Sequence, residues 1–225
     1  MDRKTHILRS NEAYNLITNA IAQNRKIKDG KLLTPSEVEE LIYYLLKDIY
    51  KDKYIRLTND NENELQRIID QLRYGDIVVR LPKEDLNIEV KSEKPYMGLY
   101  KLRIDLEYDK IQSNTGDYLG WYIHLVSYDK IYVHFHENTN KYKSTVFVIN
   151  NPYQLMLDIK GLIYSAELEY NKPYLYNSVY FEVFRNPIDG YKVTTGISFN
   201  LLEESVRVRY DIDLIYLEVQ MELEP

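Results

Sequence analysis

Apolar residues recur with a helical period in two stretches near the start of the chain. Residues 11–23 carry Leu16, Ile17, Ala20 and Ile21 on one side, which predicts a first helix. A second helix is predicted to begin after Thr34, with Pro35 at its first position and Glu37 closing a capping box. Its apolar stripe consists of Val38, Leu41, Ile42, Leu45, Leu46 and Ile49.

Short apolar runs with a period of two follow, and they predict strands. The predicted strands are 54–57, 76–81, 86–92, 120–128, 130–136 and 144–149. Further helices are predicted at 65–72, 95–109 and 151–165. This mixture over residues 1–169 indicates an α/β core with a mixed central β-sheet flanked by helices.

From about residue 170 the pattern becomes almost entirely that of strands. Residues 178–185 and 191–199 flank the turn sequence NPIDG, which predicts a β-hairpin. Residues 207–221 predict one more strand. We therefore expect a β-rich C-terminal extension over 170–225 that completes the sheet, caps it or contacts another subunit.

The amino-acid composition excludes several kinds of site and of location. The chain of 225 residues has no cysteine, which excludes disulfides, thiolate catalysis and cysteine-based zinc sites. No apolar run reaches the roughly 18 to 20 residues of a membrane helix, and the first residues do not resemble a signal peptide. We therefore expect no membrane partner and a cytoplasmic location, in the host cytoplasm if the protein is viral.

The net charge of −6 argues against tight, sequence-independent binding to nucleic acid but permits a local basic face. Such a face is suggested by the early cluster of Arg25, Lys26, Lys28 and Lys31, which either contacts phosphates or is a solvated loop. The 23 tyrosines could stack on unpaired bases, or fill sheet faces and subunit contacts.

The segment from Gly75 to Ser92 carries the candidate chemistry. On the strand 86–92, Glu89 and Lys91 project from one face, about 7 Å apart along the strand, opposite an apolar core face. If the strand 76–81 pairs with it, Asp76 can approach Glu89. Two carboxylates and a lysine at one point would suit a divalent cation with bound water, which is typical of phosphate chemistry.

This segment resembles the core motif of the PD-(D/E)xK nuclease superfamily, which includes restriction endonucleases and archaeal Holliday-junction resolvases. The family pattern is a helix, a strand, an Asp that opens the next strand, a Glu-x-Lys strand and a helix. Asp76 and Glu89-Val90-Lys91 match it, twelve residues separate the two acids, and Gly75 stands where the family often has proline. The resemblance covers roughly residues 34–110 and implies a restriction-endonuclease-like fold.

The resemblance also implies roles. Asp76, Glu89 and the Val90 carbonyl would bind Mg²⁺ or Mn²⁺, and Lys91 would orient the attacking water. The family often adds a glutamate from the preceding helix, and both Glu39 and Glu37 remain open for this role. The tyrosine-rich, cysteine-free composition further resembles nuclease-like proteins of archaeal spindle-shaped viruses. Residues 95–109, in the place of the family's next helix, lack the glutamine that resolvases tend to use there.

These observations predict a metal-dependent endonuclease that acts on DNA, branched or structured DNA included, as a homodimer or larger homo-oligomer. The alternative is a nuclease fold kept as a DNA-binding or protein-assembly module without turnover, and a third reading is a structural protein with no nucleic acid partner. By themselves, a Glu-x-Lys pair is common on solvated strands and Asp76 could be a turn residue. His134 and His136 share a strand face but lack a third ligand at a recognisable spacing, which favours packed or surface histidines.

Overall fold

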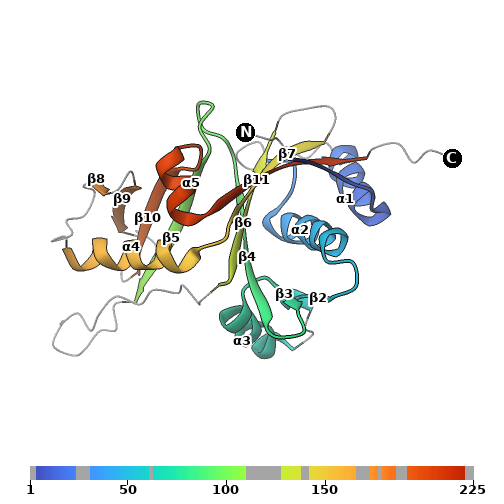
Figure 1. Cartoon of the computed structure of the whole chain (residues 1–225), viewed down its shortest axis with the longest axis horizontal. Coiled ribbons are helices and arrows are strands. Elements are labelled where there is room, and N and C mark those ends of the chain that lie inside the picture. The colour runs from blue at the N-terminus through green and yellow to red at the C-terminus, as the bar shows by residue number, and fades with distance from the viewer. Residues whose placement is uncertain are drawn as a thin grey trace.

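The computed structural model describes residues 4–23, 31–60, 63–109, 128–137, 142–165, 173–176, 179–185 and 192–220. Within them the chain is a mixed α/β protein with a seven-stranded main sheet and a separate four-stranded sheet (Figure 1). The helices are α1 (Asn11–Ala22), α2 (Pro35–Ile49), α3 (Glu64–Tyr74), α4 (Pro152–Ser165) and α5 (Glu204–Tyr210), with a 3-10 turn η2 (Thr58–Asp60). The prediction of an α/β fold with a mixed central sheet is confirmed.

The main sheet has the strand order β1-β11-β7-β6-β4-β3-β2. Its strands are β1 (Lys4–Leu8), β2 (Tyr54–Leu57), β3 (Ile77–Arg80), β4 (Asp85–Glu93), β6 (Lys130–His136), β7 (Lys143–Ile149) and β11 (Ile212–Val219). The pairs β4/β6 and β1/β11 are parallel and the other pairs are antiparallel. The sheet is therefore mixed, and β2 lies at one edge of it.

A second sheet, with the order β5-β10-β9-β8, is wholly antiparallel. It is formed by β5 (Lys101–Asp109), β8 (Pro173–Tyr176), β9 (Val179–Arg185) and β10 (Lys192–Asn200). The predicted hairpin is present, because Arg185 of β9 pairs with Val193 of β10. Strands from the predicted extension thus enter both sheets, since β11 pairs with β7 in the main sheet.

Two hydrophobic cores lie on the two faces of the main sheet. Alternation along β6 and β7 divides their side chains between these faces, because successive residues of a strand point in opposite directions. Tyr132 and Val146 join the core beneath α1 and α2, whereas Val133 and Phe147 join the core that includes α4, α5 and the second sheet. Figure 1 shows these helices on opposite sides of the main sheet.

The predicted helix at 95–109 is wrong. The chain turns at Met97 and Gly98, which both have positive φ, and returns as β5. Leu102 and Ile104 are buried in the second core while Arg103 between them is exposed, so this segment has the period of a strand. The Glu-x-Lys strand is thus followed by a strand and not by a helix.

The strand predicted at 207–221 is wrong in its first part. Residues up to Tyr210 belong to α5, which buries Val206 and Tyr210 one helical turn apart, and β11 begins only at Ile212. Asp211 joins the two elements in the left-handed conformation. The predicted strand at 120–128 lies outside the described residues except for Tyr128, and β1 is an additional strand that the sequence patterns did not indicate.

No helix in the described ranges is both long and apolar enough to cross a lipid bilayer.

Candidate functional site

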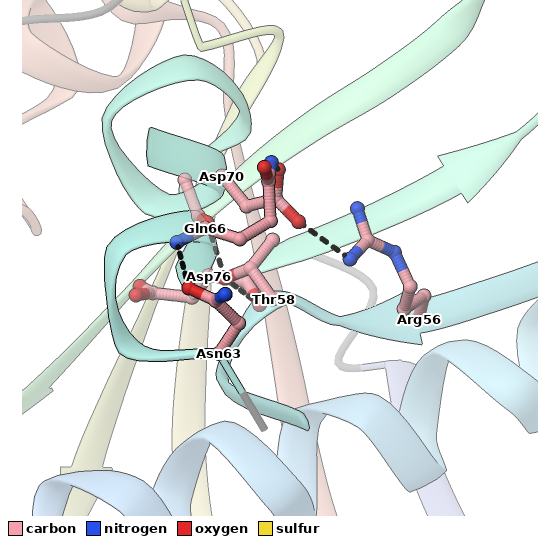
Figure 2. A network of polar contacts seen from close by, with 7 residues as sticks. Arg56, Thr58, Asn63, Gln66, Asp70 and Asp76 are labelled. Atoms are coloured by element: carbon pink, nitrogen blue, oxygen red, sulfur yellow. Dashed lines mark hydrogen bonds and ion pairs between the residues drawn. The ribbon is translucent and has the colours of Figure 1, made fainter. Parts of the chain in front are cut away.

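Asp76 occupies the junction between α3 and β3. Its backbone is fixed on two sides, because its N–H donates to the Ile88 carbonyl (2.9 Å) and its own carbonyl accepts from the Thr58 N–H (2.9 Å). The Thr58 hydroxyl also donates to the carbonyls of Gly75 (2.7 Å) and Asp76 (3.1 Å), and Thr58 is fully buried. Figure 2 shows Thr58 reaching Asp76 from the end of β2. The carboxyl of Asp76 is therefore presented from a rigid backbone.

Gly75 gives the chain its sharp entry into this junction. It has φ 77° and ψ −151°, a conformation open to glycine alone, and a Cβ there would lie 2.8 Å from the Ile88 carbonyl oxygen. Proline fixes φ near −65° and cannot adopt this conformation. Glycine and not proline is therefore required at this position, because the chain reaches Asp76 directly from the C-terminus of α3.

The β4 strand brings Glu89 and Lys91 to the same place. Ile88 and Val90 are buried beneath α2, so Glu89 and Lys91 project from the opposite face, as their alternation predicted. The Lys91 ammonium is hydrogen-bonded to the Glu89 carboxylate. Between them, the Val90 N–H donates to Asp76 Oδ2 at 2.7 Å. This bond joins Asp76 to the Glu89–Lys91 segment.

The Val90 carbonyl oxygen points to the same side as its N–H, because both groups of a strand residue face the same neighbour. That side faces Asp76 and is opposite to β6. The carbonyl that the family resemblance marks as a ligand is therefore directed at the site.

Of the two helix glutamates, Glu39 lies near the site and Glu37 does not join it. Glu39 accepts from Asn59 Nδ2 (2.5 Å), and Asn59 Oδ1 in turn accepts from Gln71 of α3 (2.5 Å). Burial raises the pKa of Glu39, and the negative charge of Glu89 raises it further. Glu37 instead completes the capping box with Thr34, whose backbone N–H donates to it at 2.8 Å.

Asp76, Glu89 and Glu39 thus form a group of carboxyls with Lys91 beside them. Burial, followed by the charges of Glu89 and Glu39, raises the pKa of Asp76 to about 8, against the opposing effects of the Val90 N–H and Lys91. Tyr128, just before β6, is hydrogen-bonded to Glu89, and its burial raises the pKa of its hydroxyl. The folded chain therefore disfavours ionisation of Asp76 beside Glu89 and Glu39, whose charges Lys91 does not fully offset.

This donor set has the chemistry that Mg²⁺ or Mn²⁺ requires, namely carboxylate oxygens and a backbone carbonyl. In the described part of the chain, however, no three His, Cys, Asp or Glu side chains are arranged to hold a metal ion. Each of the three carboxyls is turned to an internal donor: Asn59 for Glu39, Val90 for Asp76 and Lys91 for Glu89. The site fits a divalent cation in donor type, and these side chains would have to turn toward it on binding.

The other sequence candidates lie apart from this group. Arg25, Lys26 and Lys28 are outside the described residues, and Lys31 Nζ donates to the Ser92 carbonyl at 2.7 Å. His134 and His136 are buried, their rings 4.7 Å apart, and bond to Tyr142 (2.7 Å) and Ser92 (3.0 Å). Burial lowers the pKa of both, to about 4 for His136, as expected for packed neutral histidines.

Sequence reasoning missed Asn59, Gln71, Thr58 and Tyr128. Asn59 and Thr58 lie in the 3-10 turn η2 and Gln71 lies in α3, and no spacing in the sequence distinguishes these polar residues from solvated positions. Only their hydrogen bonds to Glu39 and to the Asp76 backbone mark them.

Comparison with protein-family models, with curated proteins and with solved structures finds no match to this chain.

Proposed function

We propose that this chain is a metal-dependent nuclease that hydrolyses phosphodiester bonds in DNA, with a restriction-endonuclease-like core built from α2, β2, β3, β4 and β6. The observation that carries the proposal is the 2.7 Å bond from the Val90 N–H to Asp76, with Glu89 and Lys91 on either side of Val90. The succession of helix, strand, Asp76 before β3 and Glu-x-Lys in β4 supports it. The insertion of α3 before Asp76 and the strand β5 after β4 distinguish this chain from the family pattern.

In this proposal Asp76, Glu89 and the Val90 carbonyl hold the cation, and Glu39 supports them from α2. A bound Mg²⁺ or Mn²⁺ supplies Lewis-acid polarisation of the phosphate and a more acidic water. Lys91 donates to the incoming water or to a phosphate oxygen, where its positive charge stabilises the charge that develops in the transition state. Thr58 and the Ile88 carbonyl keep the Asp76 backbone in place.

The test is cleavage of duplex, branched and single-stranded DNA, and of RNA, by purified protein in Mg²⁺ or Mn²⁺ and in EDTA. We expect metal-dependent cleavage of at least one DNA substrate, reduced about a hundredfold in Glu89→Gln, since an uncharged amide is a weaker ligand. Asp85→Asn is the matched control, because Asp85 lies on the same strand but pairs with Arg80 at 3.5 Å. Cleavage that persists in EDTA, or equally in both variants, would contradict the proposal.

The two helix glutamates give a second prediction. Glu39→Gln should lower the cleavage rate about tenfold to a hundredfold, because Glu39 supports the metal ligands. Glu37→Ala should leave that rate unchanged and lower the free energy of unfolding by about 1 kcal/mol, through loss of the capping box. Cleavage assays and urea unfolding of both variants measure the two effects. If Glu37 and not Glu39 supported the metal ligands, Glu37→Ala would instead lose cleavage without a fall in the free energy of unfolding.

A second candidate function is a nuclease fold that binds DNA or protein without turnover. It is favoured by the internal hydrogen bonds that engage Glu39, Asp76 and Glu89 in place of a ready-made metal arrangement. Calorimetry of Mn²⁺ binding distinguishes the two: the nuclease requires Mn²⁺ affinity that falls in Glu89→Gln. The binding module requires DNA or protein affinity that is independent of the metal.

A further inference from the structure

Helix α3 packs against the rest of the protein through its polar face. Asp70 is only 7% exposed, and its carboxylate accepts from Arg56 of β2 (2.9 Å) and from Gln66 one turn earlier (2.8 Å). Gln71 reaches Asn59 on the same side. Figure 2 shows Arg56 and Asp70 pointing toward one another between β2 and the helix. A buried carboxylate thus stands where an ordinary amphipathic helix would carry a leucine.

Leu65, Ile68 and Ile69 of α3 point the other way. Leu65 is 68% exposed, Ile68 45% and Ile69 44%. Their spacing of three and four residues places them in one stripe along the helix, which we term the outer face of α3. Figure 1 shows α3 at the periphery of the molecule, beyond β3. A helix that buries its polar side and exposes Leu and Ile is arranged for contact with another surface.

The charges at the ends of α3 indicate what that surface is. Glu64 lies in the first turn and Arg73 in the last. In a twofold pair of antiparallel α3 helices, the acidic end of each helix lies beside the basic end of the other. The two helix dipoles are then antiparallel and attract one another. With one acid and one base, the helix ends show no bias toward a polyanion such as DNA. The apolar stripe, by contrast, is complementary to itself.

We propose that the outer face of α3 packs antiparallel against the same face of a second copy of this chain. α3 has 11 residues and is therefore about 16 Å long, so the helix pair alone buries less than the roughly 800 Å² per partner of a standard stable interface. The dimer is accordingly weak and depends on concentration. This inference does not rest on the proposed nuclease activity, because it is tested by the mass of the protein particle in solution and not by cleavage of DNA.

Sedimentation velocity of the full chain over a hundredfold range of concentration should show a monomer that converts to a dimer. Ile68→Glu should raise the dimer dissociation constant at least about tenfold, because it puts a charge at the centre of an apolar contact. Val208→Glu is the matched control, since Val208 is 76% exposed on another helix, α5, and should leave the constant unchanged. A monomer at every concentration, or equal weakening by both variants, overturns the proposal.

Cross-linking tests the contact itself, because the chain has no cysteine of its own. Ile69→Cys should form a disulfide-linked dimer on mild oxidation, and Val208→Cys should not. Vesicles of phosphatidylcholine and phosphatidylserine test the other surface that an exposed amphipathic helix suits. Vesicle binding that is lost in Ile68→Glu, by a chain that stays monomeric in solution, would overturn the dimer and assign α3 to a lipid surface.

Discussion

Asp76→Asn is expected to reduce metal-dependent cleavage on the order of a thousandfold, the equivalent of about 4 kcal/mol of lost transition-state stabilisation. The loss should exceed that of Glu89→Gln for a geometric reason. The Val90 N–H donates to Asp76 Oδ2, and the single side-chain oxygen of an asparagine could not serve both that donor and the cation. Cleavage of the preferred DNA substrate, compared with that by Asp85→Asn, measures the effect.

The same variant should be more stable than the wild type in EDTA, and increasingly so as the pH rises. Burial and the charges of Glu89 and Glu39 raise the folded-state pKa of Asp76 from 3.8 to about 8. Between these values the folded chain keeps a proton that the unfolded chain releases, so wild-type stability falls with rising pH in this window. An asparagine does not titrate. The free energies of unfolding of the two proteins should be similar near pH 4 and should differ by several kcal/mol near pH 8.

Thermal unfolding of both proteins in EDTA across this pH range checks the sign. A wild type that is more stable than Asp76→Asn at pH 8 without metal would show that Asp76 is ionised and satisfied by its neighbours. In that case the carboxyl group would have no excess negative charge for a cation to offset, and the metal proposal would lose its electrostatic support.

Gly75→Ala should lower the free energy of unfolding by about 3 kcal/mol and also impair cleavage. The added Cβ would meet the Ile88 carbonyl oxygen at 2.8 Å and Tyr128 Cε1 at 3.0 Å, in a backbone conformation that L residues avoid. Relief of these contacts requires β3 to move away from β4, which would lengthen the bond between the Val90 N–H and Asp76. Urea unfolding and the cleavage assay report on the two consequences.

Gly98→Ala is the matched control for this effect. Gly98 also has a positive φ, of 75°, but a Cβ there meets no atom within 4 Å. Its cost should be only the backbone strain, about 1 kcal/mol, with cleavage unchanged. Equal losses of stability in the two variants would mean that the approach to Ile88 has no special role at Gly75.

Local signals in the sequence determined several features of this protein. The Thr34–Glu37 capping box begins α2, since both partners lie within one helical turn. The alternation in β4 placed Glu89 and Lys91 opposite the core, and antiparallel pairing of β3 with β4 brought Asp76 to them. These features depend on residues that are close in the chain, where period and turn chemistry limit the outcomes.

Tertiary structure alone decided the rest. Residues 101–109 carry a local strand signal, because Leu102 and Ile104 alternate with charged residues, but their partner β10 lies almost a hundred residues later and no local pattern encodes it. The choice of Glu39 over Glu37 depends on Asn59 and Gln71, which reach α2 only in the folded chain. The orientation of α3, with its polar side buried, follows from Arg56. Arg56 gives the Asp70 carboxylate a charged partner and so turns the apolar side of the helix outward. Burial, hydrogen-bond satisfaction and charge pairing act across the whole chain, so the sequence supplied the candidate residues and the fold selected among them.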